Sequence, residues 1–186
     1  MAKTDNAHLE DKLKLRRHFL DKYTKPGFSV IDCCAGSGHI WNALRSEYDC
    51  KYWGIDVKPK NGRLKADSAR ILGAGATADV VDIDTYGSPW KHWINLLPNI
   101  SKDIIVFLTI GSTHTGNQQQ KALELSGLVF NSLKCPPTLS AKFREIITRC
   151  CVANTCKHDI LITEGQRVMY ERVSYIGLAL KKQKGK

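Results

Sequence analysis

The residues best suited to ligand chemistry follow an apolar segment near the start of the chain. Asp32 stands at the end of that segment, and a turn of small residues containing Ala35, Gly36 and Gly38 comes next. Glycines let the backbone approach a ligand closely, and the N–H groups that begin a helix offer hydrogen-bond donors. This turn predicts a nucleotide-like ligand. A pyrophosphate cofactor such as NAD is disfavoured, because Trp41 stands where the dinucleotide fingerprint has its third glycine.

A second group of functional side chains ends a later apolar segment. Asp82, Asp84 and Tyr86 stand close together and are followed by Gly87 and a Ser-Pro pair that is typical of a helix start. Packing alone does not explain so many polar groups at one strand end. In an open α/β sheet, ligands bind beyond the carboxyl ends of the strands, where this segment and the glycine turn would meet.

The elements that must position these residues alternate between strands and helices. Short apolar runs predict parallel strands, buried on both faces, at residues 28–33, 51–57, 79–84 and 103–110. Helical periodicity predicts helices at residues 39–45, 88–97, 116–130 and 139–152. This alternation is typical of an α/β fold with a mostly parallel sheet and helices on both faces.

The two ends of the chain have patterns of their own. Residues 1–25 are polar and basic, and several leucines among the charges predict a short amphipathic helix. After residue 158, two apolar segments around a turn at residues 164–166 predict an antiparallel strand pair at the end of the sheet. Residues 181–186 are basic and are expected to form a solvated tail. We therefore expect residues 1–186 to form a single domain.

The segment at residues 29–41 resembles the first motif of the class I S-adenosylmethionine-dependent methyltransferases. In that family an acid at the strand end precedes an A-G-S-G or similar turn. The resemblance implies a Rossmann-like class I methyltransferase fold and S-adenosyl-L-methionine as the cofactor. It places Asp32 near the ammonium group of the cofactor, and Ala35, Gly36 and Gly38 along its amino-acid part.

Two later acids match further elements of the same family. Asp56 closes the second predicted strand. The resemblance assigns it the ribose hydroxyls of the cofactor, which one carboxylate can accept in a bidentate grip. Asp67 resembles the acid that accepts a hydrogen bond from the adenine amine. The alternative for Asp67 is a surface aspartate or a helix cap.

The loop after the third predicted strand carries the expected substrate chemistry. An exocyclic base amine is a poor nucleophile, and a carboxylate that accepts its hydrogens stabilises the positive charge that develops on nitrogen. Asp84 is therefore the expected catalytic residue, and Tyr86 the aromatic face on which the base stacks. The run from Asp82 to Pro89 resembles the D-x-D-P-[FY]-G-S-P element of the tRNA guanine dimethyltransferases, with Thr85 in place of proline.

Charge and composition limit the class of partner. Twenty-eight Lys and Arg against 18 Asp and Glu give a net charge of +10, which favours binding to a polyanion such as nucleic acid. The basic run at residues 12–17 has two interpretations, contact with a phosphate backbone or a solvated helix face. No apolar stretch reaches the roughly 20 residues of a membrane span, so membrane insertion is not expected.

The cysteines favour a reducing, cytoplasmic setting. The sequence has 7 of them, with no C-x-x-C pair and no signal-like apolar run near its start. Cys150, Cys151, Cys156 and His158 are residue types that bind zinc, but their spacing matches no common structural zinc pattern. We expect buried free thiols here and no metal.

Together these features predict a methyltransferase that acts on an exocyclic base amine of nucleic acid, with tRNA-like guanine in RNA favoured over DNA. Two alternatives stay open. A DNA amine methyltransferase normally has an acid or Asn followed by Pro-Pro and an aromatic residue, and the aromatic residue here comes one place too early. A cofactor-binding, nucleic-acid-associated protein without catalysis is favoured by Thr85. A protein partner for substrate recognition is also compatible with a chain of this size.

Overall fold

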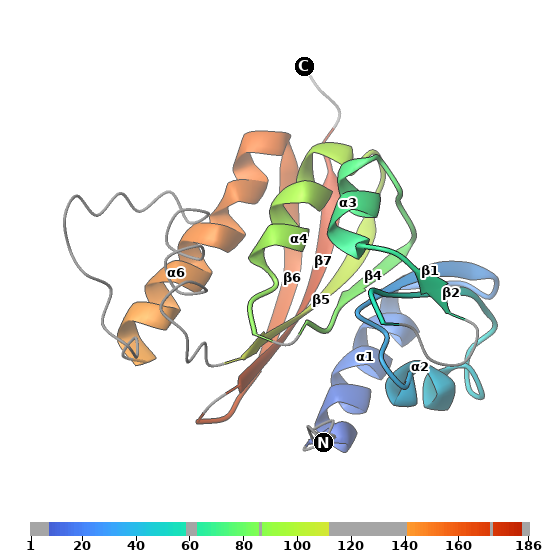
Figure 1. The fold of residues 1–186 in the computed structure, drawn as a ribbon. Helices are drawn as coiled ribbons and strands as arrows, with labels where there is room; N and C mark the ends of the chain where they lie inside the picture. The colour runs from blue at the N-terminus through green and yellow to red at the C-terminus, as the bar shows by residue number, and fades with distance from the viewer. Residues whose placement is uncertain (1–7, 59–62, 86, 112–140, 172, 184–186) are drawn as a thin grey trace.

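One sheet holds the strands of the described residues, in the order β3-β2-β1-β4-β5-β7-β6 (Figure 1). The computed structural model describes residues 8–58, 63–85, 87–111, 141–171 and 173–183. The strands that run parallel are β1 (Phe28–Cys33), β2 (Cys50–Asp56), β3 (Leu64–Lys65), β4 (Val80–Ile83) and β5 (Ile104–Gly111). An antiparallel pair, β6 (Ile160–Met169) and β7 (Val173–Lys182), completes the sheet through pairing of β7 with β5.

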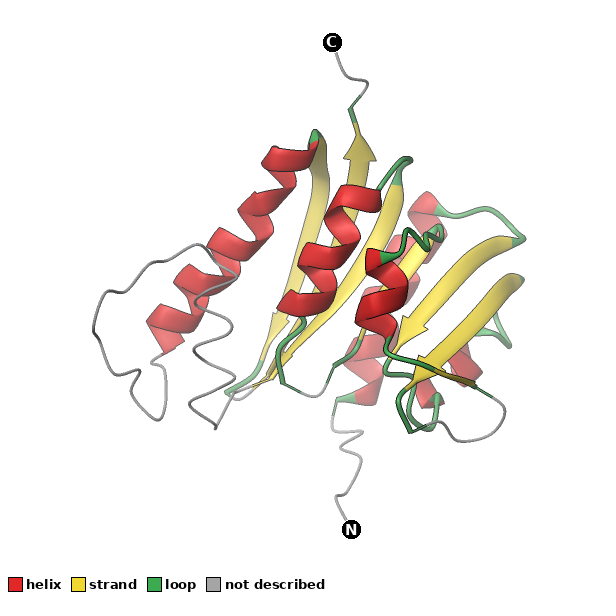
Figure 2. Ribbon diagram, turned by 45° about the horizontal axis from the view of Figure 1, so that its top comes forward, coloured by secondary structure: helices red, strands yellow, loops and turns green. Residues whose placement is uncertain are grey.

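Helices cover both faces of this sheet (Figure 2). One face carries α1 (Leu9–Tyr23) and α2 (His39–Leu44). The other carries α3 (Ser68–Gly73), α4 (Trp90–Leu96) and α6 (Ala141–Ala153), with the short 3-10 helices η1 (Leu97–Asn99) and η2 (Asn154–His158). The predicted α/β fold, with a mostly parallel sheet and an antiparallel C-terminal pair, is confirmed.

The central strands are buried on both sides because their apolar residues alternate between two cores. Val30 and Val80 face the core beneath α1 and α2, whereas Ile31 and Val81 face the core beneath α3, α4 and α6. Successive side chains of a strand point to opposite faces, so a continuous apolar run supplies both cores at once. This arrangement leaves polar residues at the carboxyl ends of β1, β2 and β4.

Helix α1 lies close against the sheet because β7 has a glycine where the two meet. Phe19 of α1 is fully buried and packs edge-on against Phe107 of β5. A Cβ atom built on Gly177 of β7 would lie 2.5 Å from a ring carbon of Phe19, closer than real side chains approach. Gly177 therefore permits the contact that seats α1 on this face.

The predicted elements are mostly present, with small shifts at their ends. The strand at residues 28–33 is confirmed as β1, and the other three predicted strands differ from β2, β4 and β5 by one residue at each end. The helices predicted at residues 39–45 and 88–97 are confirmed as the shorter α2 and α4, and the one at 139–152 as α6. The helix predicted at residues 116–130 lies outside the described residues.

Two predictions near the C-terminus are wrong. Residues 164–166 do not form a turn, because Gly165 pairs with Leu178 inside β6 and only a bulge between Ile162 and Glu164 interrupts the ladder. The chain reverses after Met169 instead. The solvated tail predicted at residues 181–186 is wrong at its start, where Lys181 and Lys182 still belong to β7.

Candidate cofactor and catalytic site

A turn of small residues joins β1 to α2 and leaves space beside its backbone. Gly36 and Gly38 have φ angles of 50° and 68°, in the left-handed region that glycine adopts without strain. An ideal Cβ atom on Gly36 would meet only the carbonyl oxygen of Cys34, at 3.8 Å. Ala35 precedes these glycines, and its N–H donates to the Ile55 carbonyl of β2 at 2.9 Å. A ligand could therefore approach this backbone closely.

Asp56 lies directly against this turn. Its Oδ2 accepts a hydrogen bond from the Gly36 N–H at 2.9 Å, and its Oδ1 accepts one from the Lys58 N–H at 2.8 Å. The structure therefore brings together the glycine turn and the acid at the end of β2. A carboxylate has about four lone-pair positions, so each oxygen can still accept a hydroxyl proton.

Asp32 is a buried acid near the end of β1, the strand that leads into the same turn. Its Oδ2 accepts a hydrogen bond from the Tyr52 hydroxyl at 2.7 Å, and the residue is 4% exposed. Burial, followed by repulsion from Asp82, raises the pKa of Asp32 well above its ordinary value, although the Tyr52 hydrogen bond opposes this. Among the described residues, no ion pair gives Asp32 a cationic partner. A ligand ammonium group would therefore be stabilised here.

Arg63 covers the far side of the glycine turn. Its Nη2 donates to the Ser37 carbonyl at 3.0 Å. A Cβ atom on Gly38 would lie 1.8 Å from that same Nη2, so any other residue here would displace the guanidinium from this position. Arg63 thus places a positive charge against the turn.

Asp67 caps helix α3. Its Oδ1 accepts hydrogen bonds from the Ala69 and Arg70 N–H groups at 3.0 and 3.4 Å, and Lys91 donates to its Oδ2 at 3.3 Å. Burial alone would raise the pKa of Asp67, but the Lys91 contact and the two N–H donors lower it. The structure thus shows Asp67 as the N-cap of α3, shortly after the end of β3. A contact with adenine stays a prediction.

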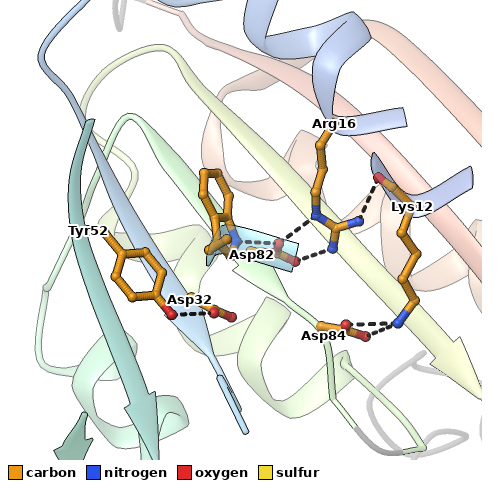
Figure 3. Close-up of polar contacts among 7 residues, drawn as sticks. Lys12, Arg16, Asp32, Tyr52, Asp82 and Asp84 are labelled. Carbon is orange, nitrogen blue, oxygen red and sulfur yellow. Dashed lines mark hydrogen bonds and ion pairs between the residues drawn. The ribbon is translucent and has the colours of Figure 1, made fainter. Parts of the chain in front are cut away.

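Asp84 follows β4 and is paired with a cation from α1 (Figure 3). Lys12 Nζ lies 2.9 and 3.2 Å from the two carboxylate oxygens, and both side chains are largely shielded from solvent. Burial would raise the pKa of Asp84. The positive charges of Lys12 and Arg16, and hydrogen bonds from Thr109 and Lys12, outweigh that effect and lower it. Asp84 is therefore held ionised.

Asp82 forms the centre of the same network. Arg16 Nε and Nη2 each lie 2.7 Å from one of its carboxylate oxygens, and Trp41 Nε1 donates to Oδ2 at 2.8 Å. Arg16 also donates to the carbonyl of Lys12 at 3.1 Å, which ties the two cations of α1 together. The bidentate pair is almost completely buried. Asp82 therefore holds α1 and α2 on the sheet.

Neither interpretation of the basic run at residues 12–17 fits Lys12 and Arg16, since both are buried ion-pair partners. Lys14 is exposed, and Arg17 pairs with Glu47 at the surface. The signal lay in the spacing, because Lys12 and Arg16 share a helical face with buried Phe19. Sequence reasoning therefore missed these two partners of the strand-end acids.

The rest of the β4 loop is described in part. Tyr86 lies outside the described residues. Thr85, the residue that departs from the proline of the resembling motif, is buried, and its hydroxyl has no hydrogen-bond partner in the described structure. Gly87 fastens the loop to β5, because its carbonyl accepts from the Gly111 N–H at 2.7 Å.

Neither a metal centre nor a membrane span is found in the part of the chain that the structure describes. No three His, Cys, Asp or Glu side chains gather as metal ligands there. The cysteines at 150, 151 and 156 are free thiols, but only Cys151 is buried as expected, whereas Cys150 is half-buried and Cys156 is exposed. No described helix is both long enough and apolar enough to cross a membrane.

No protein-family model and no curated protein matches the sequence. Solved structures do match. The chain is similar to Trm1 from Pyrococcus horikoshii in complex with S-adenosyl-L-methionine, with a TM-score of 0.68 and 15% identity over 98% of this chain and 56% of that one. It therefore spans just over half the length of Trm1.

Two smaller proteins are matched over most of their length. The plantazolicin methyltransferase BamL, in complex with a triazolic desmethylPZN analog and SAH, gives a TM-score of 0.56 and 10% identity over 98% of this chain and 87% of BamL. The plantazolicin methyltransferase BpumL in complex with SAH gives 0.55 and 12% over 94% of this chain and 83% of BpumL. At these identities the likeness concerns the fold. The protein has the Rossmann-like class I methyltransferase fold, and Trm1 is one example of it.

Proposed function

We propose that the protein transfers a methyl group from S-adenosyl-L-methionine to an exocyclic amine of a base in nucleic acid, with RNA favoured. The observation that carries this proposal is the ionised carboxylate of Asp84, held by Lys12 at the end of β4 in a class I methyltransferase fold. Asp84 supplies the acceptor that an amine nucleophile needs.

The residues around the glycine turn fit the proposed cofactor. Asp32 is a buried acid without a cation of its own and suits the ammonium group of the methionine part. Asp56 holds the turn and retains lone pairs for the ribose hydroxyls. The open space beside the Gly36 backbone leaves room for the part of the cofactor that links its ammonium group to its ribose. When bound, the cofactor's sulfonium group supplies an electrophilic methyl group.

Asp84 assists the transfer through its charge. With the cofactor bound, the amine nitrogen would form a bond to its methyl carbon while the carbon–sulfur bond breaks and sulfur keeps the electron pair. Nitrogen becomes positively charged, and Asp84, which accepts a hydrogen bond from the amine, stabilises that charge and takes up the departing proton. Because the acceptor is already ionised and fixed by Lys12, little reorganisation is needed during the reaction.

Nucleic acid as the substrate is supported by two sequence features. The net charge of +10 favours a polyanion. The loop from Asp82 to Pro89 resembles that of enzymes that methylate guanine amines in tRNA.

Incubation of the purified protein with labelled cofactor, and separately with total RNA and genomic DNA, tests this proposal through nucleoside mass spectrometry. Label on a base amine of RNA is the expected result. Label in DNA alone would favour the DNA enzyme, and cofactor binding without transfer to either polymer would favour a non-catalytic protein.

Two substitutions separate the proposed roles. Asp84→Asn should lower the turnover number on the order of 100-fold or more and leave cofactor affinity, measured by calorimetry, nearly unchanged. Asp56→Ala should instead weaken cofactor binding. Asp103→Asn provides the matched control, because this exposed aspartate directly precedes β5, at the end of the strands opposite to Asp84. If Asp84→Asn transferred methyl groups as fast as the unmodified protein, the catalytic role would be wrong.

A further inference from the structure

The outer edge of β2 is only partly covered. In the described chain, β3 pairs with β2 at Ile55 and Asp56, and no strand neighbours residues 50–54 on that side. A hollow of about 560 Å³ lies along this edge. It is lined by Asn42, Arg45, Tyr52, Trp53, Gly54, Arg63 and Leu64. This volume falls within the range of small-ligand sites, roughly 300–1,000 Å³.

The lining of this hollow is positively charged. Two arginines and no acidic residue contribute to it. The Arg45 guanidinium lies over the Tyr52 ring, 5.1 Å from its centroid, which restrains its orientation. Arg63 is restrained by its hydrogen bond to the Ser37 carbonyl. Among the described residues, Arg45 forms no ion pair, and a restrained guanidinium group suits the oxygens of a phosphate.

Trp53 adds an aromatic surface to the same hollow. It is 59% exposed, whereas Trp41, Trp90 and Trp93 are each at most 2% exposed. An exposed indole beside guanidinium groups is the combination that binds single-stranded nucleic acid, in which bases stack on aromatic rings and phosphates pair with cations. The hollow also borders the glycine turn, since Arg63 contacts both.

We propose that this hollow is a binding subsite for a single-stranded segment of nucleic acid, in which Arg45 and Arg63 contact a backbone phosphate and Trp53 stacks on an unpaired base. The choice of polymer rests on the proposed function. The subsite holds a nucleotide away from the one that is modified, because Asp84 follows β4, two strands away from β2 in the sheet.

Tryptophan fluorescence reports on this subsite directly. A single-stranded RNA oligonucleotide should quench the emission of the protein, because Trp53 is the exposed indole and the other three are buried. Trp53→Phe should abolish the quenching but retain partial stacking. Trp53→Ala should weaken binding, measured by fluorescence anisotropy, on the order of 10- to 100-fold.

Salt dependence tests the phosphate contact. Arg45→Ala should weaken binding and reduce the slope of log K against log salt by about one. Arg149→Ala is the matched control, because it removes an exposed arginine of α6 that does not line the hollow. It should bind RNA as the unmodified protein does.

The outcomes separate this inference from the proposed function. If Trp53→Ala and Arg45→Ala bind RNA normally while RNA is methylated, the subsite is wrong and the function stands. If RNA quenches Trp53 but receives no methyl group, the subsite stands and the function is wrong. If S-adenosylmethionine alone quenches Trp53 and competes with RNA, the hollow belongs to the cofactor and the inference is overturned.

Discussion

Asp32 and Asp84 lie near the ends of neighbouring strands, yet their surroundings shift the pKa values of the two carboxyl groups in opposite directions. Asp32 has a phenol as its partner, and its pKa is raised. Asp84 has an ammonium group as its partner, and its pKa is lowered. A buried carboxyl without a cation favours a ligand that brings one, whereas a carboxylate with an internal cation is ready to accept hydrogen bonds. The two halves of the site are thus suited to different tasks.

The source of this difference is α1. Lys12 and Arg16 reach Asp84 and Asp82 of the β4 segment, but Asp32 of β1 receives neither side chain directly. Substitutions in α1 should therefore affect the half of the site around β4, and substitutions around the glycine turn should affect the other half.

Removal of Arg16 should have the largest effect. Arg16→Met leaves the buried Asp82 carboxylate without its bidentate partner, and loss of one member of a buried pair costs about 3–5 kcal/mol. Urea denaturation measures this as a decrease in the free energy of unfolding. Arg17→Met is the control on the same helix, and its surface pair with Glu47 should matter little. Equal stability of the two variants would show that α1 is not anchored through Asp82.

Lys12→Met should change the pH dependence of methyl transfer. Without Lys12, burial of Asp84 is opposed by fewer charges, so the pKa of Asp84 rises. The acid limb of the pH–rate profile should then move to higher pH, while Lys12→Arg keeps it close to its original position. Lys14→Met, at an exposed position of α1, is the control. A titration of the Asp84 carboxyl by NMR checks the same shift without an activity assay.

The smallest effect is expected at Asp32. Because its folded-state pKa is raised, the folded protein holds a proton that the unfolded chain releases near pH 4, and the cofactor-free protein loses stability as pH rises towards the raised pKa. Asp32→Asn should remove this loss and raise the melting temperature at neutral pH, yet weaken cofactor binding. A variant less stable than the unmodified protein at neutral pH, but equally stable in acid, would contradict this prediction.

The sequence predicted the parts of the site that depend on local pattern. The glycine turn and Asp56 follow strands that short apolar runs identify, and parallel strands bring their carboxyl ends together. Asp67 was recognisable as a helix cap, although β3 and α3 around it are too short for a clear periodicity. The roles of the site residues, including Tyr86, stay predictions.

The ion pairs of α1 could not be predicted from local sequence pattern. Arg16 and Asp82 are separated by 66 residues and Lys12 and Asp84 by 72, so no spacing rule links them. The same limit explains why the turn predicted at residues 164–166 is wrong. Glu164 forms hydrogen bonds with His18, Lys22 and Tyr23 of α1, and this distant contact accompanies a continuous strand where glycine suggested a turn.

The position of α1 has a consequence for synthesis of the chain. This helix is synthesised before its partners Asp82, Gly177 and Glu164, which follow much later in the chain. Lys12 and Arg16 thus have no counter-ions until the β4 segment has been made, and Phe19 cannot pack against Gly177 until β7 has been made. Helix α1 consequently docks late although it is made early, and nascent chains that stop before β7 should leave it accessible to proteases.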